Sequence, residues 1–263
     1  MILEKDFTKL TPKQRLYYRI LFQKDFYSFA KYFWCEADPS QFIDGFLPKF
    51  YCEFFQYMAR PWIGYEGLEK EPEVPEPDEN TVILDVRQDK HNACINVPPR
   101  HSKSMIFNVL AGVWIWLNEP IKLASVSHTG DLAGKMNSKR QAILNSERFR
   151  FFFPEIELAT NSTFTLVDKR GAELYSMNRN SLTGYGFDIG IMDDLTNAEA
   201  ARKDKEEMNN AWSFYQNTLP SRINNVDKYV LFNIQQRLSP NDITGRISNN
   251  SEMKPFLVKQ FRL

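Results

Sequence analysis

From residue 93 onward, short apolar segments alternate with longer segments whose apolar residues recur at helical spacing, and this alternation constrains the fold more than any other feature. Strands separated by helices need crossover connections, which are right-handed and place successive strands parallel in one sheet. We therefore predict an α/β fold with a mainly parallel central sheet flanked by helices. The expected strand and helix pairs are 93–98 with 104–117, 121–128 with 130–149, 187–194 with 197–217, and 228–237 with a short helix in "PNDITGRI".

Three further segments extend the expected sheet. The apolar segment 81–86, "TVILDV", has the composition of a strand. The segment 163–177 is typical of a hairpin whose turn runs from Asp168 to Gly171. The final nine residues, "PFLVKQFRL", are expected to form a last strand.

The first 58 residues differ from the rest, because aromatic and apolar side chains recur at helical spacing through 11–58. We expect two or three helices there, as a small N-terminal subdomain. The acidic stretch "GLEKEPEVPEPDEN" follows, and its prolines forbid a regular helix. The predicted organisation is a helical segment or lid at 1–68, a linker or loop at 69–80, and the main core at 81–263.

The charge and cysteine content exclude several classes of protein. The chain has 33 basic and 33 acidic residues, so its bulk charge does not attract nucleic acid or an anionic membrane, and any DNA contact needs a local patch. Three widely spaced cysteines show no metal-binding or redox spacing. The N-terminus lacks an apolar signal core, and the longest apolar run, 105–117, is too short to span a bilayer. We expect a soluble intracellular protein with no membrane partner.

The stretch "INVPPRHSKSMIFN" at 95–108 is typical of a phosphate-binding loop between a strand and a helix. Lys103 and Ser104 stand at the Lys-Ser positions of the pattern G-x-x-x-x-G-K-[ST], whereas Val97 and Ser102 replace its two glycines. A left-handed conformation at Ser102 would be strained, because serine has a Cβ atom. The alternative interpretation is a proline turn before a buried helix, with Lys103 solvated.

Such a loop binds a nucleotide through backbone N–H groups, a lysine near the phosphates and a hydroxyl on Mg²⁺. Prolines lack the N–H group, so the cradle has to come from residues 100–104. The candidate nucleotide-binding residues in this loop are Pro99, Arg100, His101, Ser102, Lys103 and Ser104.

Two adjacent acids, Asp193 and Asp194, end the apolar strand "DIGIMDD". A phosphate-binding loop enzyme needs one carboxylate at such a strand end to hold Mg²⁺ through water, and a second acid to activate the attacking water. We assign Asp193 to the metal and Asp194 to the water. The alternative is a strand end that carries ordinary surface acids.

Four stretches in sequence order carry a resemblance to a known family: "NVPPRHSKS", "ASVSHTGDLAGKMNSKRQAIL", "SLTGYGFDIGIMDDLTNAEAA" and "QQRLSPNDITGRI". Over about residues 80–250, the chain resembles the ATPase domain of the large terminase subunits of tailed bacteriophages, the motors that package viral DNA. In that branch of the family a glycine precedes the Lys-Ser pair, so Ser102 is a departure. The resemblance implies an additional-strand (ASCE) P-loop fold, with ATP and Mg²⁺ as cofactors.

The resemblance also implies roles for individual residues. Arg100 matches a loop arginine that touches the γ-phosphate or switches between states, and Lys103 and Asp194 are the other catalytic candidates. The segment "LFNIQQR" resembles the motif that couples hydrolysis to movement. Either Gln235 or Gln236 contacts phosphate or water, because adjacent strand residues face opposite sides, and we favour Gln236.

Ring motors complete each site with an arginine from a neighbouring subunit. Arg140 is the candidate, and Arg148, Arg150 and Arg202 compete with it. His128 ends a predicted strand, where a packing or capping role outweighs catalysis. Adenine recognition is poorly marked: Gln56 is one candidate, and stacking on Phe50 or Tyr51 is another, although their helical spacing favours core packing.

The expected partners follow from the same resemblance: double-stranded DNA, the portal and procapsid, the small terminase subunit, and further copies of the chain in a ring, all in the host cytoplasm. The family's nuclease domain is not expected within these residues, so we predict no nuclease activity from them. Two other functions stay open, a helicase-like or repair ATPase of the same wider fold and a non-hydrolysing nucleotide-binding assembly module.

Overall fold

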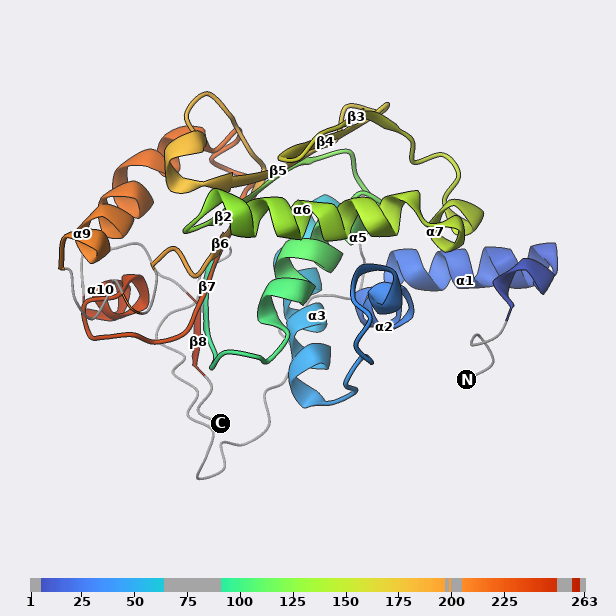
Figure 1. Ribbon diagram of the computed structural model, residues 1–263, viewed down its shortest axis with the longest axis horizontal. Helices are drawn as coiled ribbons and strands as arrows, with labels where there is room; N and C mark the ends of the chain where they lie inside the picture. Colours follow the sequence, from blue (N-terminus) through green and yellow to red (C-terminus); the bar gives the residue numbers. More distant parts are fainter. Residues whose placement is uncertain (1–5, 64–90, 197–198, 200–204, 250–256, 261–263) are drawn as a thin grey trace.

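The computed structural model of the chain describes residues 6–63, 91–196, 199, 205–249 and 257–260 (Figure 1). The predicted strand 81–86 and the acidic proline-rich segment lie outside the described residues. So do the expected boundaries near residues 68 and 80, which stay predictions.

Among the described residues, eight strands form one sheet in the order β3-β4-β5-β2-β6-β7-β1-β8. The strands are β1 (Asn92–Asn96), β2 (Lys122–Ser127), β3 (Leu158–Asn161), β4 (Thr165–Asp168), β5 (Glu173–Asn178), β6 (Ile189–Asp193), β7 (Val230–Gln235) and β8 (Leu257–Gln260). Six of them, from β5 to β8 in the sheet order, pair in parallel. β4 pairs antiparallel with β5, and β3 with β4.

The position of β7 identifies the fold. β7 lies between β1, which leads into the Lys-Ser loop, and β6, which ends in the paired acids. An extra strand between these two is the arrangement expected of an additional-strand P-loop fold, so the predicted α/β fold class is confirmed. Every residue of β1, β6 and β7 is buried, as central parallel strands covered by helices on both faces require.

The predicted hairpin at 163–177 is confirmed, because β4 and β5 pair across a turn in which Gly171 has a φ of 90°. The expected helix 130–149 is instead two helices. Ser146 is extended, with a ψ of 145°, and its side chain caps the second helix by accepting from the Phe149 N–H. β3 extends the hairpin to a third strand that the sequence patterns do not mark.

Helices cover both faces of the sheet (Figure 1). The longer ones are α1 (Pro12–Lys24), α2 (Phe26–Ala37), α3 (Phe46–Met58), α6 (Gly130–Asn145) and α9 (Lys205–Ser213). The shorter α-helices are α4 (Arg60–Ile63), α5 (Ala111–Ile115), α7 (Glu147–Phe152) and α10 (Ile243–Asn249). The π-helices are η3 (Met105–Leu110) and η5 (Phe214–Thr218), and the 3-10 turns are η2 (Phe7–Lys9), η4 (Arg179–Ser181) and η6 (Pro220–Arg222).

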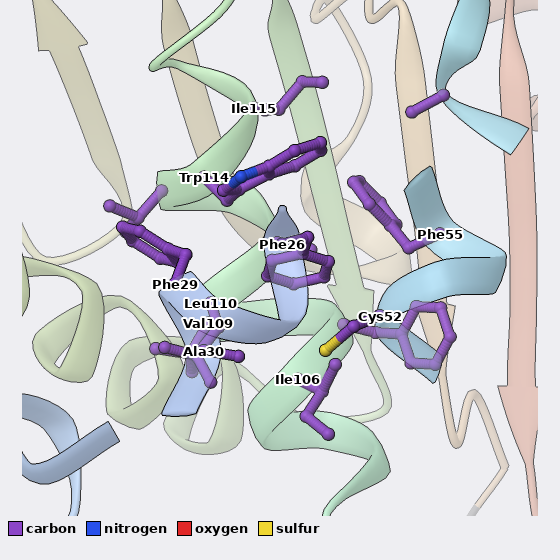
Figure 2. Packing of buried hydrophobic residues seen from close by; sticks show 14 of the residues in the cluster. Phe26, Phe29, Ala30, Cys52, Phe55, Ile106, Val109, Leu110, Trp114 and Ile115 are labelled. Carbon is purple, nitrogen blue, oxygen red and sulfur yellow. The ribbon is translucent and has the colours of Figure 1, made fainter. Parts of the chain in front are cut away.

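The N-terminal helices share one hydrophobic core with the helix that follows the Lys-Ser loop. Phe26 of α2 stacks on Trp114 of α5, with ring centroids 4.9 Å apart, and Phe55 of α3 stacks on Phe232 of β7 at 5.2 Å. Figure 2 shows Phe26, Phe55 and Trp114 gathered in this core. The opposite face of the sheet packs against α9, η5 and α10 around a second cluster. The first three long helices are thus built into the main body of the molecule.

Candidate functional site

The site lies where the parallel strands end. Asn96, Asp193 and Gln235 are the last residues of β1, β6 and β7, and the register pairs Asn96 with Gln235 and Asp193 with Ile234. In an open α/β sheet, ligands bind outside the carboxyl ends of the strands. The loop that follows β1 and the acid that follows β6 therefore meet at one edge.

The loop after β1 contains two residues in the left-handed region. Ser102 has a φ of 62°, as expected for a residue at a glycine position, and Arg100 has a φ of 68°. Such a conformation costs a non-glycine residue about 1–2 kcal/mol. The His101 ring nitrogen Nδ1 lies 2.8 Å from the Pro99 carbonyl oxygen and 3.1 Å from that of Pro98, so as a donor it ties the loop to its own start. These residues lead directly into η3.

Lys103 and Asp194 form an ion pair across the site. The Lys103 Nζ donates to Asp194 Oδ2 at 2.6 Å, and only 6 % of the lysine side chain is exposed, against 29 % for the aspartate. The Gln236 backbone N–H donates to Asp194 Oδ1 at 3.0 Å. Asp194 itself has a φ of 44°. Both oxygens of this strained acid are therefore held, one by the loop and the other by the end of β7.

Asp193 is buried beside this pair, with 1 % of the residue exposed. Burial raises the pKa of Asp193 to about 6, and the neighbouring Asp194 charge adds to this, while Lys103 and a hydrogen bond from Ser104 act in the opposite direction. The Asn108 side-chain amide donates to Asp193 Oδ2 at 2.7 Å. Asp193 Oδ1 is buried and has no hydrogen-bond partner among the described residues.

The buried Asp193 oxygen without a hydrogen-bond partner and the nearby Ser104 hydroxyl fit a binding site for a magnesium ion. Mg²⁺ prefers oxygen ligands and is bound through one or two carboxylates, retained waters and substrate phosphates. The unpartnered Asp193 oxygen is a ligand of this kind, and so is the Ser104 hydroxyl, which lies close enough to the Asp193 carboxyl group to lower its pKa. The residues that the sequence assigned to the metal are thus brought to one place.

The two glutamines at the end of β7 point to different surroundings. Gln235 is 6 % exposed, and its amide donates to the Thr244 hydroxyl of α10 at 3.0 Å. Gln236 is partly exposed, and its backbone contacts Asp194. Of the pair, Gln236 is therefore the one next to the acid. Its contact with phosphate or water stays a prediction.

The expectation that Arg140 serves a neighbouring subunit is wrong. Arg140 is fully buried, with its Nε donating to the Asn108 carbonyl at 2.6 Å and its Nη1 to the Ser176 hydroxyl at 2.7 Å. Burial lowers the pKa of Arg140 to about 9. A guanidinium enclosed within its own subunit does not reach the nucleotide of another. The signal that misled the prediction is a basic residue on a helix that is polar for most of its length.

The other arginines proposed to act on a neighbouring subunit, and His128, have the following surroundings. Arg148 of α7 packs on the Tyr32 ring and pairs with Glu36 at 3.1 Å, whereas Arg150 is exposed. Arg202 lies outside the described residues. The Nδ1 of His128 is buried, with no hydrogen-bond partner in the described part of the chain.

The residues predicted as candidates for adenine recognition stabilise the packing of the N-terminal helices. Gln56 accepts from the Phe26 N–H at 3.1 Å and donates to the Lys24 carbonyl at 2.6 Å, which holds the α1–α2 junction. Phe50 and Tyr51 are buried in the main core, as their helical spacing favoured.

Sequence reasoning missed Asn108. It is the residue that contacts Asp193 directly, and it is fully buried in an otherwise apolar helix. Its position was a signal, since Asn108 follows Ser104 by four residues and so shares its helix face.

No protein-family model and no curated protein matches the chain. Among solved structures, it is similar to the ATPase domain of the Thermus phage P74-26 large terminase in a mutant form, with 17 % sequence identity and a TM-score of 0.40. That likeness covers 56 % of this chain and 60 % of the other. The domain without that mutation gives 16 % identity and a TM-score of 0.36, over 56 % and 59 %. Neither likeness says which residues of this chain are functional. In the described part of the chain, no helix has both the length and the apolar character needed to cross a bilayer.

Proposed function

We propose that this chain is an ATPase that hydrolyses ATP with Mg²⁺ and uses the energy to move double-stranded DNA into a viral procapsid. One observation carries the chemistry: Lys103, Ser104, Asp193 and Asp194 meet at the carboxyl edge of an additional-strand P-loop sheet. The DNA-packaging part of the proposal is supported by the four sequence stretches that resemble terminases.

The proposed binding of ATP uses the loop and the buried acid. The backbone N–H groups of residues 100–104 and the Lys103 ammonium hold the phosphates, and Arg100 contacts the γ-phosphate. Ser104 and Asp193 would hold Mg²⁺, which would neutralise negative charge on the phosphates.

Asp194 activates the attacking water in this proposal. Its Oδ2 accepts from Lys103, for which a triphosphate is a competing and more highly charged partner. When Lys103 turns to the phosphates, Oδ2 is released to accept a proton from water. Oδ1 stays fixed by the Gln236 N–H, so the carboxylate keeps its orientation. Binding of the correct ligand thereby frees the base.

We further propose the assembly that packaging needs: a ring of copies around double-stranded DNA, docked on the portal of the procapsid, with DNA delivered by the small terminase subunit. An arginine from a neighbouring copy completes each site.

The experiment measures ATP binding and phosphate release by the purified chain. Wild-type protein is expected to bind ATP more tightly with Mg²⁺ than with EDTA, and to release phosphate. Asp194→Asn should bind ATP with similar affinity but lose turnover by about 100-fold or more, because a positioned general base contributes about 10²–10⁴-fold. Lys103→Ala should lose both ATP binding and turnover.

Two matched variants serve as controls, Asp227→Asn and Lys169→Ala. Both residues are exposed, and they precede β7 and β5, at the amino ends of the strands and opposite the site. Both should behave as wild type. Turnover in Asp194→Asn equal to the parent would refute the assignment of the base. Magnesium-dependent binding without any phosphate release would favour the nucleotide-binding assembly module. DNA-stimulated ATPase with strand separation would favour the helicase-like alternative.

A further inference from the structure

Asn108 is a fully buried polar residue whose side-chain amide is held at both ends. The Ser125 hydroxyl of β2 donates to its Oδ1 at 2.8 Å, and its Nδ2 donates to Asp193 Oδ2 at 2.7 Å. A carboxylate accepts but does not donate, so the nitrogen has to face Asp193 and the oxygen has to face Ser125. The orientation of the amide is therefore fixed by its partners.

The backbone of Asn108 is held as well. It lies in the π-helix η3; such wider turns occur mostly as short bulges within α-helices and are frequent at functional sites. The Asn108 carbonyl accepts from the buried Arg140 guanidinium of α6, which also bonds Ser176 of β5. A Cβ atom on Gly112 would lie 3.3 Å from the Arg140 Nε, so the glycine leaves room for the guanidinium. The first turns after the Lys-Ser loop are thus fastened to α6 and the sheet.

The consequence concerns Asp193. Asn108 engages only one of its oxygens, Oδ2, while Oδ1 is buried without a hydrogen-bond partner in the described residues. The Ser104 hydroxyl lies close enough to the same carboxyl group to act against the rise in its pKa. We propose that Asn108 is a positioning residue that holds Asp193 Oδ2, so that Oδ1 and the Ser104 hydroxyl are left for the divalent cation that accompanies the nucleotide. This inference rests on the proposed function and deepens it.

A purely structural role makes a different prediction. If Asn108 only satisfied a buried acid, its loss would lower the stability of the fold and weaken nucleotide binding with and without metal alike. A positioning role affects the metal-dependent part of binding, because outer partners of a metal ligand set its orientation.

The test compares wild type with Asn108→Leu, which keeps the branched shape and the number of heavy atoms of the side chain but cannot form hydrogen bonds. Binding of a fluorescent ATP analogue is followed by anisotropy in EDTA and across a Mg²⁺ titration, and Mn²⁺ binding is followed by its electron paramagnetic resonance signal. Asn108→Leu should lose about 10–100-fold in apparent metal affinity. Its nucleotide affinity in EDTA should stay near that of wild type. Asn108→Asp, which places a second carboxyl group beside Asp193, should lose at least as much.

The matched control is Asn137→Leu. Asn137 is another fully buried asparagine, on α6, whose amide donates to the Ser162 carbonyl at 2.9 Å and not to an acid. This variant should lose stability but keep the metal dependence of wild type. An equal loss of metal affinity in Asn137→Leu would overturn the proposal, and so would wild-type metal affinity in Asn108→Leu.

If Asn108→Leu does not fold, Ser125→Ala decides the matter. It removes the hydroxyl that orients the amide and should weaken metal-dependent binding in the same direction, while unchanged metal affinity would overturn the proposal. Failure of the proposed function is separate and visible in wild type, because a chain that binds no ATP analogue with Mg²⁺ is not the ATPase proposed above.

Discussion

At the scale of single residues, the site contains three strained backbones. Arg100, Ser102 and Asp194 all have positive φ, and all three lie in the loop after β1 or directly after β6. Residues other than glycine adopt such conformations only where the surrounding structure holds them in place, and they are found most often at functional sites. At Asp194, the ion pair with Lys103 and the hydrogen bond from the Gln236 N–H hold the residue in this conformation. The strain is concentrated where phosphates are expected to bind.

Ser102 gives a direct measure of this strain. Ser102→Gly should raise the free energy of unfolding by up to about 1 kcal/mol, because glycine adopts a φ of 62° without a steric penalty but has more entropy to lose. Ser102→Ala keeps the Cβ atom and should give no such gain. Urea unfolding at pH 7 measures both. A gain in Ser102→Ala equal to that in Ser102→Gly would show that the hydroxyl, not the backbone, is unfavourable.

At the scale of elements, Asp38, which directly follows α2, forms an ion pair with Lys139 of α6. Hydrogen bonds from Lys139 and then from Ser40 lower the pKa of Asp38 to about 2. A carboxyl group whose pKa is lower in the folded state stabilises above its unfolded pKa of 3.8, and this contribution is lost as the pH falls through the folded pKa.

Asp38→Asn should therefore cost about 1 kcal/mol at pH 7, a value reduced by solvent screening of the partly exposed pair. The difference from wild type should stay constant down to about pH 5 and disappear between about pH 4 and 2. Urea unfolding at several pH values measures it. Glu157→Gln, in the exposed pair with Lys169, is the control and should show no measurable loss. A difference that grows on acidification would contradict the sign.

The helix α10 depends on a glycine for its close contact with the loop that follows β7. A Cβ atom on Gly245 would lie 2.2 Å from the Pro240 carbonyl oxygen, a backbone atom that cannot move without the loop. Gly245→Ala should destabilise by about 1–3 kcal/mol, as overpacking does. In α6, a Cβ atom on Gly134 meets only side chains at 3.5 Å or more, so Gly134→Ala should stabilise by about 0.5–1 kcal/mol. Thermal unfolding of the two variants should shift in opposite directions.

At this scale the sequence predicts most of the sheet, since apolar runs of strand length mark β1, β2, β6 and β7. It does not predict β3, a short strand with three exposed residues in four and no apolar pattern. The break at Ser146 is also missed, because a serine that caps a new helix looks the same in a polar helical pattern as one that continues the old helix.

At the scale of the whole molecule, the site's acids and loop were predictable because each follows a strand, and parallel strands end at one edge. Asn108 and Arg140 were not, because their partners come from distant elements. Ser125 and Ser176 lie on β2 and β5, and only the folded chain brings them to η3 and α6. A helix pattern says which face is polar, but it does not say that a polar residue on the buried face meets a partner.

The N-terminal helices give the last prediction, because a lid and a part of the core respond differently to the same change. Phe55 of α3 is fully buried between Phe232 of β7 and Trp114 of α5. Phe55→Ala should cost about 3–5 kcal/mol and lower the stability of the whole domain. Unfolding in urea, followed by far-UV circular dichroism and by tryptophan fluorescence, should give coincident transitions, as one cooperative unit requires.

Tyr17→Ala is the control, since Tyr17 on α1 is 61 % exposed and a surface substitution changes stability by about 0.5 kcal/mol or less. An early transition in Phe55→Ala that leaves the sheet folded would instead show that the first three long helices form a separable lid. Because the aromatic core continues from α2 and α3 through α5 to β7, a movement of these helices has to repack the helix that carries Lys103 and Ser104. We therefore expect any motion of the N-terminal helices to be coupled to the Lys-Ser loop.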